Sequence, residues 1–275
     1  MNSDIPRLSV VMPSFNQVEF IERSMLSIIN QKYPNLQLII IDGGSSDGTL
    51  DIIEKYKRHI DYFISEADNG QSDALNKGFK VADGDIFGWL NSDDIYLPGS
   101  VKVAIDALQK HKNKSIVFGD WLSIDENDKA IDHHFAFDFS VNHFKYEGFH
   151  LNAQSMFWQK ETHERFSGFI VSLYNTMDYQ MILEFGINEG DDFFLRIPVN
   201  IGAFRRYNGQ KTAGITDIVI NEHKYLAQHY LYMDKYESLG SVKRLFFRFR
   251  RAYWYLKRGG FKELMNRVKM SYFQP

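Results

Sequence analysis

Two adjacent carboxylates, Asp93 and Asp94, follow an apolar segment at residues 85–90 that we predict to be a strand. Like charges held side by side repel each other, and a cation between them relieves the repulsion. Carboxylate oxygens suit Mg²⁺ or Mn²⁺, which usually also bind substrate phosphates. The pair therefore indicates a cation site, with the alternative that Asp94 caps the next helix and Asp93 is a solvated loop residue.

Polar clusters follow each of four predicted strands, and the carboxylate pair belongs to the last of them. The clusters are at residues 13–16, 42–48, 66–71 and 91–94. One such cluster is typical of a turn. Four at successive strand ends favour a binding site, because ligands of an open parallel sheet bind outside the carboxyl ends of its strands.

The elements that would position these clusters alternate along the first 120 residues. Strands are predicted at 8–12, 36–41, 61–65, 85–90 and 115–118, and helices at 18–29, 49–56, 72–81 and 98–110. This alternation predicts an α/β fold with a mainly parallel sheet flanked by helices. After residue 120 it gives way to predicted strands at 155–158, 193–197 and 203–206 and helices at 177–185 and 217–236.

Composition excludes several classes of protein. The absence of cysteine excludes disulfides, iron–sulfur clusters and thiol nucleophiles, and the nine histidines form no zinc motif. No Gly-x-Ser-x-Gly elbow or dinucleotide fingerprint supports a hydrolase or a dehydrogenase. The apolar runs are far shorter than the ~20 residues of a membrane span. These features predict a cytoplasmic protein, soluble or peripheral at the inner face of the cell membrane.

Four ordered motifs carry a resemblance to a known family. They are SVVMPSFN (9–16), IDGGSSDGT (41–49), DNGQSDALNKG (68–78) and WLNSDD (89–94). Together they resemble family-2 inverting glycosyltransferases with the GT-A fold, with a weaker match to about residue 212. The resemblance implies transfer of one sugar, a hexose or N-acetylhexosamine, from a nucleotide-sugar donor, UDP-linked, to a glycan or lipid-linked glycan in surface polysaccharide synthesis.

The resemblance also implies which residues bind the donor. By position they are Pro13, Ser14, Asn16, Asp42, Asp68, Gly70, Gln71, Asn76, Asn91 and Ser92. Asp93 occupies the position of the family's metal ligand for Mn²⁺ or Mg²⁺. Asn91 replaces the first carboxylate of the family's Asp-x-Asp motif, which lowers the ligand charge.

Asp178 is the candidate catalytic base, because it matches the family's aspartate at the start of a helix, after Gly168 and Phe169. An acceptor hydroxyl that attacks the anomeric carbon must lose its proton, and a carboxylate on the acceptor side can take it. The alternative is an ordinary acidic residue at a helix N-terminus.

Two later segments resemble other parts of the family site. Gln154 and Trp158 lie on a strand that faces the acceptor in the family, although a core position is the alternative for Trp158. Arg205 and Lys211 belong to a loop that closes over the diphosphate and could contact phosphate oxygens. Tyr207 stands where that loop often carries a histidine.

Charge divides the chain unevenly. Residues 241–275 carry a net charge of +9 and the remaining 240 residues one of −12, so the body is not expected to bind nucleic acid. The basic, aromatic tail is predicted to meet an anionic membrane surface, or to pack on the body while its cations stay solvated. We expect residues 1–120 to bind the nucleotide sugar, 121–215 to hold the acceptor and base, and 216–275 to be helical.

Two other functions are also considered from the sequence. A sugar nucleotidyltransferase would carry a basic, glycine-rich loop after the first strand, and residues 13–17 contain neither glycine nor lysine. A non-catalytic sugar-nucleotide-binding scaffold would be favoured by Asn91 and Tyr207 at positions where the family has ligands.

Overall fold

The computed structural model describes residues 5–147, 151–211, 217–231 and 238–273, and its centre is one mixed sheet. Along this sheet the strand order is β3-β2-β1-β4-β8-β6-β9-β5, with β7 paired to β6. The strands are β1 (Leu8–Ser14), β2 (Leu36–Asp42), β3 (Tyr62–Ser65), β4 (Ile86–Trp89), β5 (Ile95–Tyr96), β6 (Ile116–Ile124), β7 (Ala130–His134), β8 (Met156–Gln159) and β9 (Phe194–Arg205).

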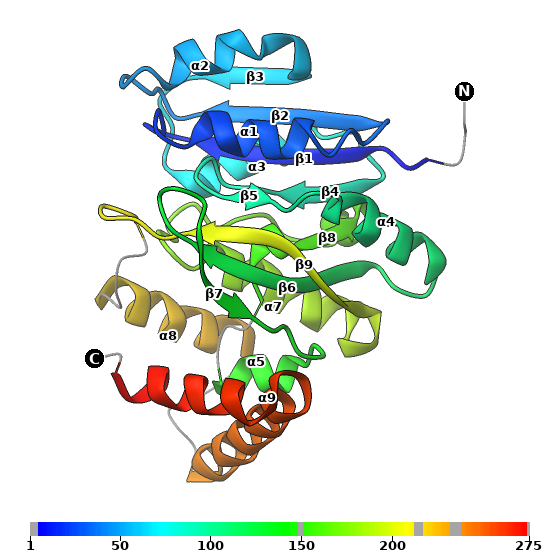
Figure 1. The fold of residues 1–275 in the computed structure, drawn as a ribbon, viewed down its shortest axis with the longest axis vertical. Helices are drawn as coiled ribbons and strands as arrows, with labels where there is room; N and C mark the ends of the chain where they lie inside the picture. The colour runs from blue at the N-terminus through cyan, green and yellow to red at the C-terminus, as the bar shows by residue number, and fades with distance from the viewer. Residues whose placement is uncertain (1–4, 148–150, 212–216, 232–237, 274–275) are drawn as a thin grey trace.

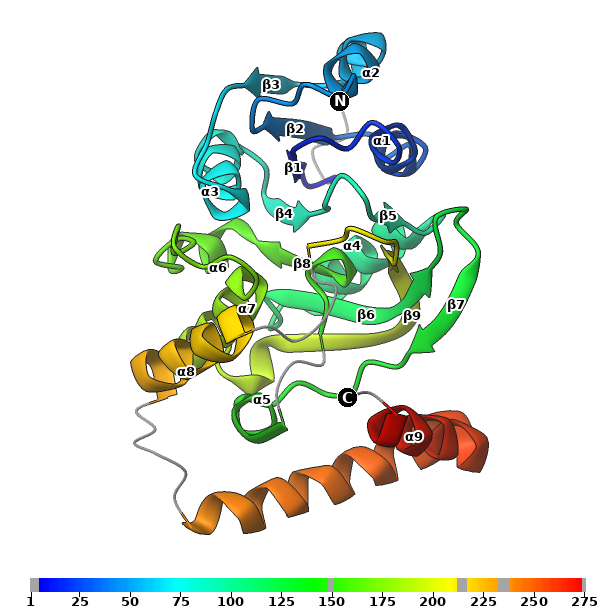
Figure 2. The same cartoon turned by 90° about the vertical axis from the view of Figure 1, so that its left-hand side faces the viewer.

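Helices cover both faces of this sheet (Figures 1 and 2). They are α1 (Ile21–Ile29), α2 (Thr49–Lys55), α3 (Gln71–Val81), α4 (Ser100–Lys110), α5 (Val141–Glu147), α6 (Lys160–Glu164), α7 (Met177–Glu189), α8 (Asp217–Leu231) and α9 (Ser238–Phe273). Short 3-10 turns lie at Lys57–His59, Ala153–Ser155 and Asp191–Phe193.

Side chains alternate between two cores because successive residues of a strand point to opposite faces. Val11 and Ile39 pack with α3 and α7 on one face, whereas Val10 and Leu38 pack with α1, α2 and α4 on the other. Burial on both faces explains why these strands are nearly continuous apolar runs in the sequence. The α/β class with a mainly parallel first half is confirmed.

The second half of the sheet differs in detail from the sequence prediction. The two strands expected at 193–197 and 203–206 form one strand, β9, whose pairing with β6 shifts register around Asp120. Pro198 lies at this irregularity, where its missing N–H costs the ladder no bond. The short strands β5 and β7 and the helix α5 were not predicted, since each has too few residues to show a period.

All strands that matter for the site end at the same edge. β1, β2, β3 and β4 are mutually parallel, and β8 runs antiparallel to both β4 and β6. β9 runs parallel to β6, so its carboxyl end meets those of the first four strands. Residues from both predicted halves, 1–120 and 121–215, therefore converge there. The boundary at 215 and the predicted helical residues 232–236 lie outside the described residues.

The C-terminal helix α9 lies along one end of the molecule, against α5 and β7 (Figure 2). It bends at Gly260, whose φ of 71° interrupts the helical geometry. Arg258, just before the bend, forms an ion pair with Asp120 at 2.7 Å. Arg267, after the bend, forms one with Asp132 at 3.0 Å. Among the described residues, no helix is long and apolar enough to cross a membrane.

Candidate active site

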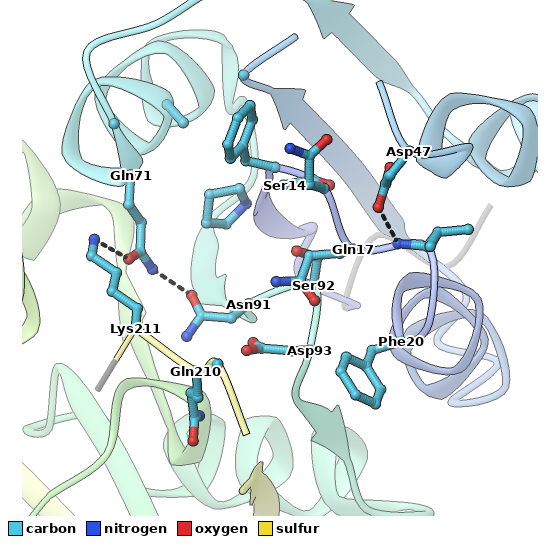
Figure 3. A pocket seen from close by; sticks show the side chains of 18 of the residues that line it. Ser14, Gln17, Phe20, Asp47, Gln71, Asn91, Ser92, Asp93, Gln210 and Lys211 are labelled. Atoms are coloured by element: carbon cyan, nitrogen blue, oxygen red, sulfur yellow. Dashed lines mark hydrogen bonds between the residues drawn. The ribbon is translucent and has the colours of Figure 1, made fainter. Parts of the chain in front are cut away.

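A cavity of about 820 Å³ opens at the shared carboxyl edge of β1, β2, β3, β4 and β9 (Figure 3). Its walls come from the loops that follow these strands. Of the predicted donor residues, those that line it are Pro13, Ser14, Asn16, Asp68, Gly70, Gln71, Asn91, Ser92 and Lys211, together with the predicted metal ligand Asp93.

The wall after β1 is tied to the loop after β2. The backbone N–H of Asn16 donates to Ser45 Oγ at 2.7 Å, and the Asn16 side chain accepts the N–H of Ser46 at 3.0 Å. Asp42 is fully buried behind this wall, where its carboxylate accepts from the Ser45 and Ser65 hydroxyls at 2.6 and 2.8 Å. The structure thus places Asp42 under the loop and outside the cavity lining.

Asn91 is held by three hydrogen bonds at the cavity floor. Its Oδ1 accepts from Trp89 Nε1 and from Gln71 Nε2, both at 2.7 Å. Its Nδ2 donates to Asp94 Oδ2 at 3.1 Å. Both lone pairs of the amide oxygen are therefore engaged, and the side chain has one fixed orientation.

The two adjacent aspartates have different surroundings. Asp93 lines the cavity and accepts the Tyr207 hydroxyl at 2.9 Å, whereas Asp94 is fully buried and accepts the backbone N–H of Arg205 at 2.9 Å. Burial raises the pKa of both carboxyls, and the negative charge of Asp93 raises the pKa of Asp94 further. The helix-cap alternative for Asp94 is wrong, because α4 begins only at Ser100.

Arg205 lies beneath the cavity instead of lining it. Its side chain is fully buried, and its guanidinium donates to the carbonyl of Asp93 at 2.7 Å and pairs with Asp128 at 2.5 Å. These contacts hold the segment after β4 against the turn after β6. A phosphate contact from Arg205 would require its buried guanidinium to leave both the Asp93 carbonyl and the partly exposed Asp128 carboxylate.

Lys211 supplies a positive charge inside the cavity. Its Nζ donates to Gln71 Oε1 at 3.3 Å (Figure 3). The same Nζ lies 4.2 Å from the centre of the Tyr174 ring. Burial lowers the pKa of Lys211, while the nearby Glu222 and Asp178 carboxylates counteract that effect. An ammonium in this position can meet phosphate oxygens.

Asp178 lies in the first turn of α7, outside the cavity lining but near enough to Lys211 for their charges to interact. It is partly buried, and burial raises the pKa of its carboxyl to about 6, with Lys211 lowering and Glu222 raising that value. Its Oδ1 accepts the N–H of Tyr179 at 2.8 Å. A carboxylate with a pKa near 6 is a suitable general base near neutral pH.

Comparisons with known proteins agree with this geometry. The family model described as Glycosyl transferase family 2 matches residues 9–173, which is more than half of the chain.

The chain belongs to this family.

Two curated relatives illustrate the likeness in sequence. An uncharacterized glycosyltransferase of Rickettsia typhi is 34% identical over 42% of this chain and 36% of its own length. UDP-Glc:alpha-D-GlcNAc-diphosphoundecaprenol beta-1,3-glucosyltransferase WfgD of Escherichia coli is 31% identical over 44% of this chain and 47% of its own length. The matched region spans less than half of either relative.

Solved structures support the GT-A fold. TarS residues 1–349 of S. aureus in complex with UDP-GlcNAc has a TM-score of 0.66 at 15% identity, covering 92% of this chain and 74% of that one. The mannosyltransferase PcManGT of Pyrobaculum calidifontis, in complex with GDP-Man and Mn²⁺, has a TM-score of 0.57 at 13% identity, covering 98% and 80%. The resemblance to family-2, GT-A enzymes drawn from the motifs is confirmed.

GT-A glycosyltransferases commonly use a divalent cation, which needs oxygen ligands from the protein or the substrate. Within the described part of the chain, no three His, Asp or Glu side chains gather to hold a metal. Asp93 nevertheless presents a carboxylate to the cavity, and such ions are often held by one or two carboxylates plus substrate phosphates. The residues therefore fit a cation that binds together with a diphosphate, with Asn91 engaged elsewhere.

In addition to Asp42, Arg205 and Asp178, three predicted residues lie outside the cavity lining. Trp158 is fully buried and packs on Phe79 and Phe185, with ring centres 5.6 Å away in each case. Gln154 is buried against β9, and Asn76 binds the backbone N–H and carbonyl of Phe169 at 2.9 and 2.8 Å. Direct contact of these side chains with a substrate stays a prediction.

The structure also brings in residues that the sequence analysis did not place in the site. They are Gln17, Phe20, Tyr174 and Gln210, which line the cavity, and Glu222, which binds the segment before Asp178. Gln17 and Phe20 directly follow the first motif, which could have pointed to them. Tyr174 and Glu222 lie in segments without a recognisable motif, so no sequence signal could have identified them.

Proposed function

We propose that this glycosyltransferase moves one sugar from a UDP-linked donor to a lipid-linked glycan, with inversion at the anomeric carbon. One observation carries the proposal: Asp93 and Lys211 line the cavity, and a second acidic group, Asp178, lies outside the lining but near enough to Lys211 for their charges to interact. Inverting transfer needs these two tasks in different places, charge neutralisation at the leaving diphosphate and proton removal at the acceptor. The names of WfgD and of the TarS complex support UDP sugars and a diphosphate-linked lipid acceptor.

The donor would occupy the cavity with its nucleoside against the loops after β1, β2 and β3. Pro13, Ser14, Asn16 and Asp68 line this part. Asp42, which is fully buried, and Asn76, which is half-buried, would act by holding neighbouring loops in place. The diphosphate would lie against Gly70, Gln71, Asn91 and Ser92, with the Lys211 ammonium, which donates to Gln71, beside them.

Each of these groups would have one role in the sugar-transfer step. The acceptor hydroxyl oxygen bonds to the anomeric carbon while the bond from that carbon to the diphosphate oxygen breaks, and Asp178 takes the hydroxyl proton. Lys211 balances the negative charge that develops on the departing diphosphate. A divalent cation held by Asp93 and the diphosphate would add Lewis-acid stabilisation of the same charge.

Thermal unfolding with UDP, GDP, CDP or dTDP, each with Mn²⁺ or with EDTA, tests the donor class. A ligand at ~100 times its dissociation constant stabilises by roughly 2.7 kcal/mol, which raises the melting temperature by several degrees. We expect the largest shift with UDP and Mn²⁺. A shift with another diphosphate alone would overturn the UDP assignment, and no shift with any would favour the scaffold function.

A turnover assay then distinguishes an enzyme from a non-catalytic scaffold. The protein is incubated with UDP-glucose or UDP-GlcNAc and a GlcNAc-diphosphate lipid, and release of UDP and extension of the lipid are measured. Product with an inverted anomeric configuration supports the proposal. UDP binding without any product across lipid and glycan acceptors would contradict it.

The outer face of α9 would bring the enzyme to an anionic membrane surface. Its exposed apolar side chains Phe246, Phe249, Tyr253 and Leu256 recur at helical spacing on one face, and Phe249 is 67% exposed. The inner face packs on the body, where Phe247 contacts His143 and Trp254 contacts Phe137. The packing alternative thus holds for aromatic residues of the inner face, but Arg258 and Arg267 pair with Asp120 and Asp132 instead of staying solvated, and the outer face is left for the membrane. Of the predicted segment, residues 274–275 lie outside the described part.

Vesicle co-sedimentation tests this face. We expect the protein to bind vesicles of phosphatidylglycerol more strongly than vesicles of phosphatidylcholine, and Phe249→Ser to weaken binding. Phe193→Ser, which replaces another exposed aromatic residue (43% exposed) away from α9, is the matched control. Equal binding of both variants, or no preference for anionic lipid, would contradict the membrane role.

A further inference from the structure

A buried glutamate on α8 binds the segment that leads into the base-bearing helix α7. Glu222 is 9% exposed. Its Oε1 accepts the N–H of Tyr174 at 2.5 Å, and its Oε2 accepts the N–H groups of Asn175 and Thr176 at 3.0 and 3.1 Å. The Thr176 hydroxyl donates to the same Oε2 at 3.0 Å. One carboxylate thus binds four donors, from residues 46 to 48 positions earlier in the chain.

This arrangement needs a carboxylate. Two oxygens with about four lone-pair sites match the four donors, whereas a glutamine would offer one acceptor oxygen and turn an NH₂ group toward backbone N–H groups. The negative charge also lies near the N-terminus of α7, where the helix dipole favours it. A charge-assisted cluster of this kind fixes the backbone more firmly than neutral hydrogen bonds do.

The residues that Glu222 holds are next to both reacting ends of the site. Tyr174 lines the cavity, and its ring lies 4.2 Å below the Lys211 ammonium. Asp178 follows Thr176 by two residues in the first turn of α7. A shift of the 174–176 segment would therefore move the phosphate-side cation and the base together.

The geometry points to Glu222 as a positioning residue for sugar transfer: by clamping residues 174–176 it sets the placement of Asp178 relative to Lys211. Glu222 itself touches no substrate. This inference rests on the proposed function, because it names a further residue that this function requires. A misplacement of about 1 Å can cost roughly a hundred-fold in rate, so the clamp bears directly on turnover.

Glu222 also acts on Asp178 through its charge. The charged groups that face Asp178 are Lys211 after β9, which lowers the pKa of Asp178, and Glu222 on α8, which raises it. His223 on α8 packs edge-on against Tyr179, and burial lowers its pKa while the Glu222 charge counteracts that effect. Removing the Glu222 charge should lower the pKa of Asp178.

The test compares Glu222→Gln with a matched control, Glu184→Gln. Glu184, on α7, is 6% exposed and accepts the N–H and hydroxyl of Ser167 at 2.7 and 2.9 Å and the Tyr230 hydroxyl at 3.0 Å. Both variants remove a buried carboxylate with several donors. Glu184 is not among the charges that act on Asp178, so it reports the cost of a purely structural loss.

Two readouts separate the outcomes. We expect Glu222→Gln to lower kcat by about ten- to a hundred-fold, and to move the acid limb of the pH profile and the NMR titration of the Asp178 carboxyl to lower pH. Glu184→Gln should reduce the melting temperature comparably and leave both pH midpoints in place. Unchanged kcat and midpoints in Glu222→Gln, or equal changes in both variants, would overturn the inference.

The NMR titration keeps the inference distinct from the proposed function. If the wild-type protein transfers no sugar while the Asp178 titration still moves in Glu222→Gln, the proposed function fails and the clamp on Asp178 stands. If the wild-type protein transfers sugar and neither readout moves, the proposed function stands and the clamp fails. Should Glu222→Gln not fold, Glu222→Asp, which keeps the charge and shortens the side chain, is expected to lower kcat with a smaller change of midpoint.

Discussion

The two halves of the sheet build their parts of the cavity in different ways. In the half made of β3, β2, β1 and β4, each group of lining residues follows its own strand within a few positions. In the half that contains β8, β6 and β9, the lining comes from a loop after β9 and from the segment before α7, and Glu222 on α8 binds that segment. The first half is organised locally and the second by contacts between distant segments.

This difference has a consequence for function. The donor wall, made by the loops after β1, β2 and β3, is supported by hydrogen bonds between neighbouring loops, such as those of Asn16 with Ser45 and Ser46, 29 and 30 residues away. The candidate base Asp178 depends on contacts between residues further apart in the chain, because Glu222 holds the segment before it from 46 to 48 positions away. Substitutions in the second half should therefore change turnover more than donor binding, and those in the first half should do the reverse.

The largest effect is expected for Asp178→Asn. An amide cannot accept the acceptor proton, so kcat should fall by about 10²- to 10⁴-fold while UDP affinity stays the same. Rates of sugar transfer and UDP titration calorimetry would show this split. Asp51→Asn, at an exposed first-turn acid of α2, is the control. Retained turnover in Asp178→Asn would remove Asp178 from the proposed base role and with it the contrast between the halves.

A large loss of stability without a change in acceptor use is expected for Trp158→Ala. Trp158 is fully buried between α3 and α7, and removing a side chain of this size from a core costs about 3–5 kcal/mol of unfolding free energy. Denaturant unfolding measures this cost. A raised KM for the acceptor at unchanged stability would instead restore Trp158 to the acceptor site that the family resemblance implied.

An intermediate effect is expected for Lys211→Gln, because Lys211 comes from the second half and its ammonium donates to Gln71 of the first half. A hydrogen bond to a charged group contributes about 1.5–3 kcal/mol, so UDP should bind roughly ten- to a hundred-fold more weakly. Lys80→Gln, at an exposed lysine on α3, is the matched control for charge. If Lys211→Gln lowered kcat alone, Lys211 would belong to the base half and not to the diphosphate.

The local organisation of the first half also explains why its strands and site residues could be predicted from the sequence. The strands of the first half and the clusters after them were predicted because each depends on residues close together in the chain. The GT-A fold and the family are confirmed. Nine of the ten residues predicted for the loops after β1 to β4 could be placed at or directly behind the cavity, because the carboxyl ends of parallel strands necessarily meet. Asn76 supports the loop at Phe169 instead.

The second half required contacts that no local pattern records. Arg205 was predicted to meet phosphate, yet its pairing with Asp128 depends on how two distant turns pack. Glu222 resembles any acid on a surface helix until α8 is placed against α7. The aromatic residues of α9 could not be sorted by sequence because the body decides which face is covered. Tertiary packing thus overrides residue type where partners are far apart.

The smallest effect is a pH dependence that reports on Asp178 alone. The base must be ionised, so kcat should fall about tenfold per pH unit below pH 6 and level off above it. Stability changes in the opposite direction: the pKa of Asp178 is raised from 3.8 to about 6 on folding, so the folded protein holds this proton at higher pH than the unfolded chain. The contribution of Asp178 to stability is therefore full below pH 3.8 and is lost as pH rises to 6. Unfolding curves of wild type and Asp178→Asn should diverge between these pH values, with the variant gaining relative stability. A constant difference would mean that the folded protein does not raise the pKa of Asp178.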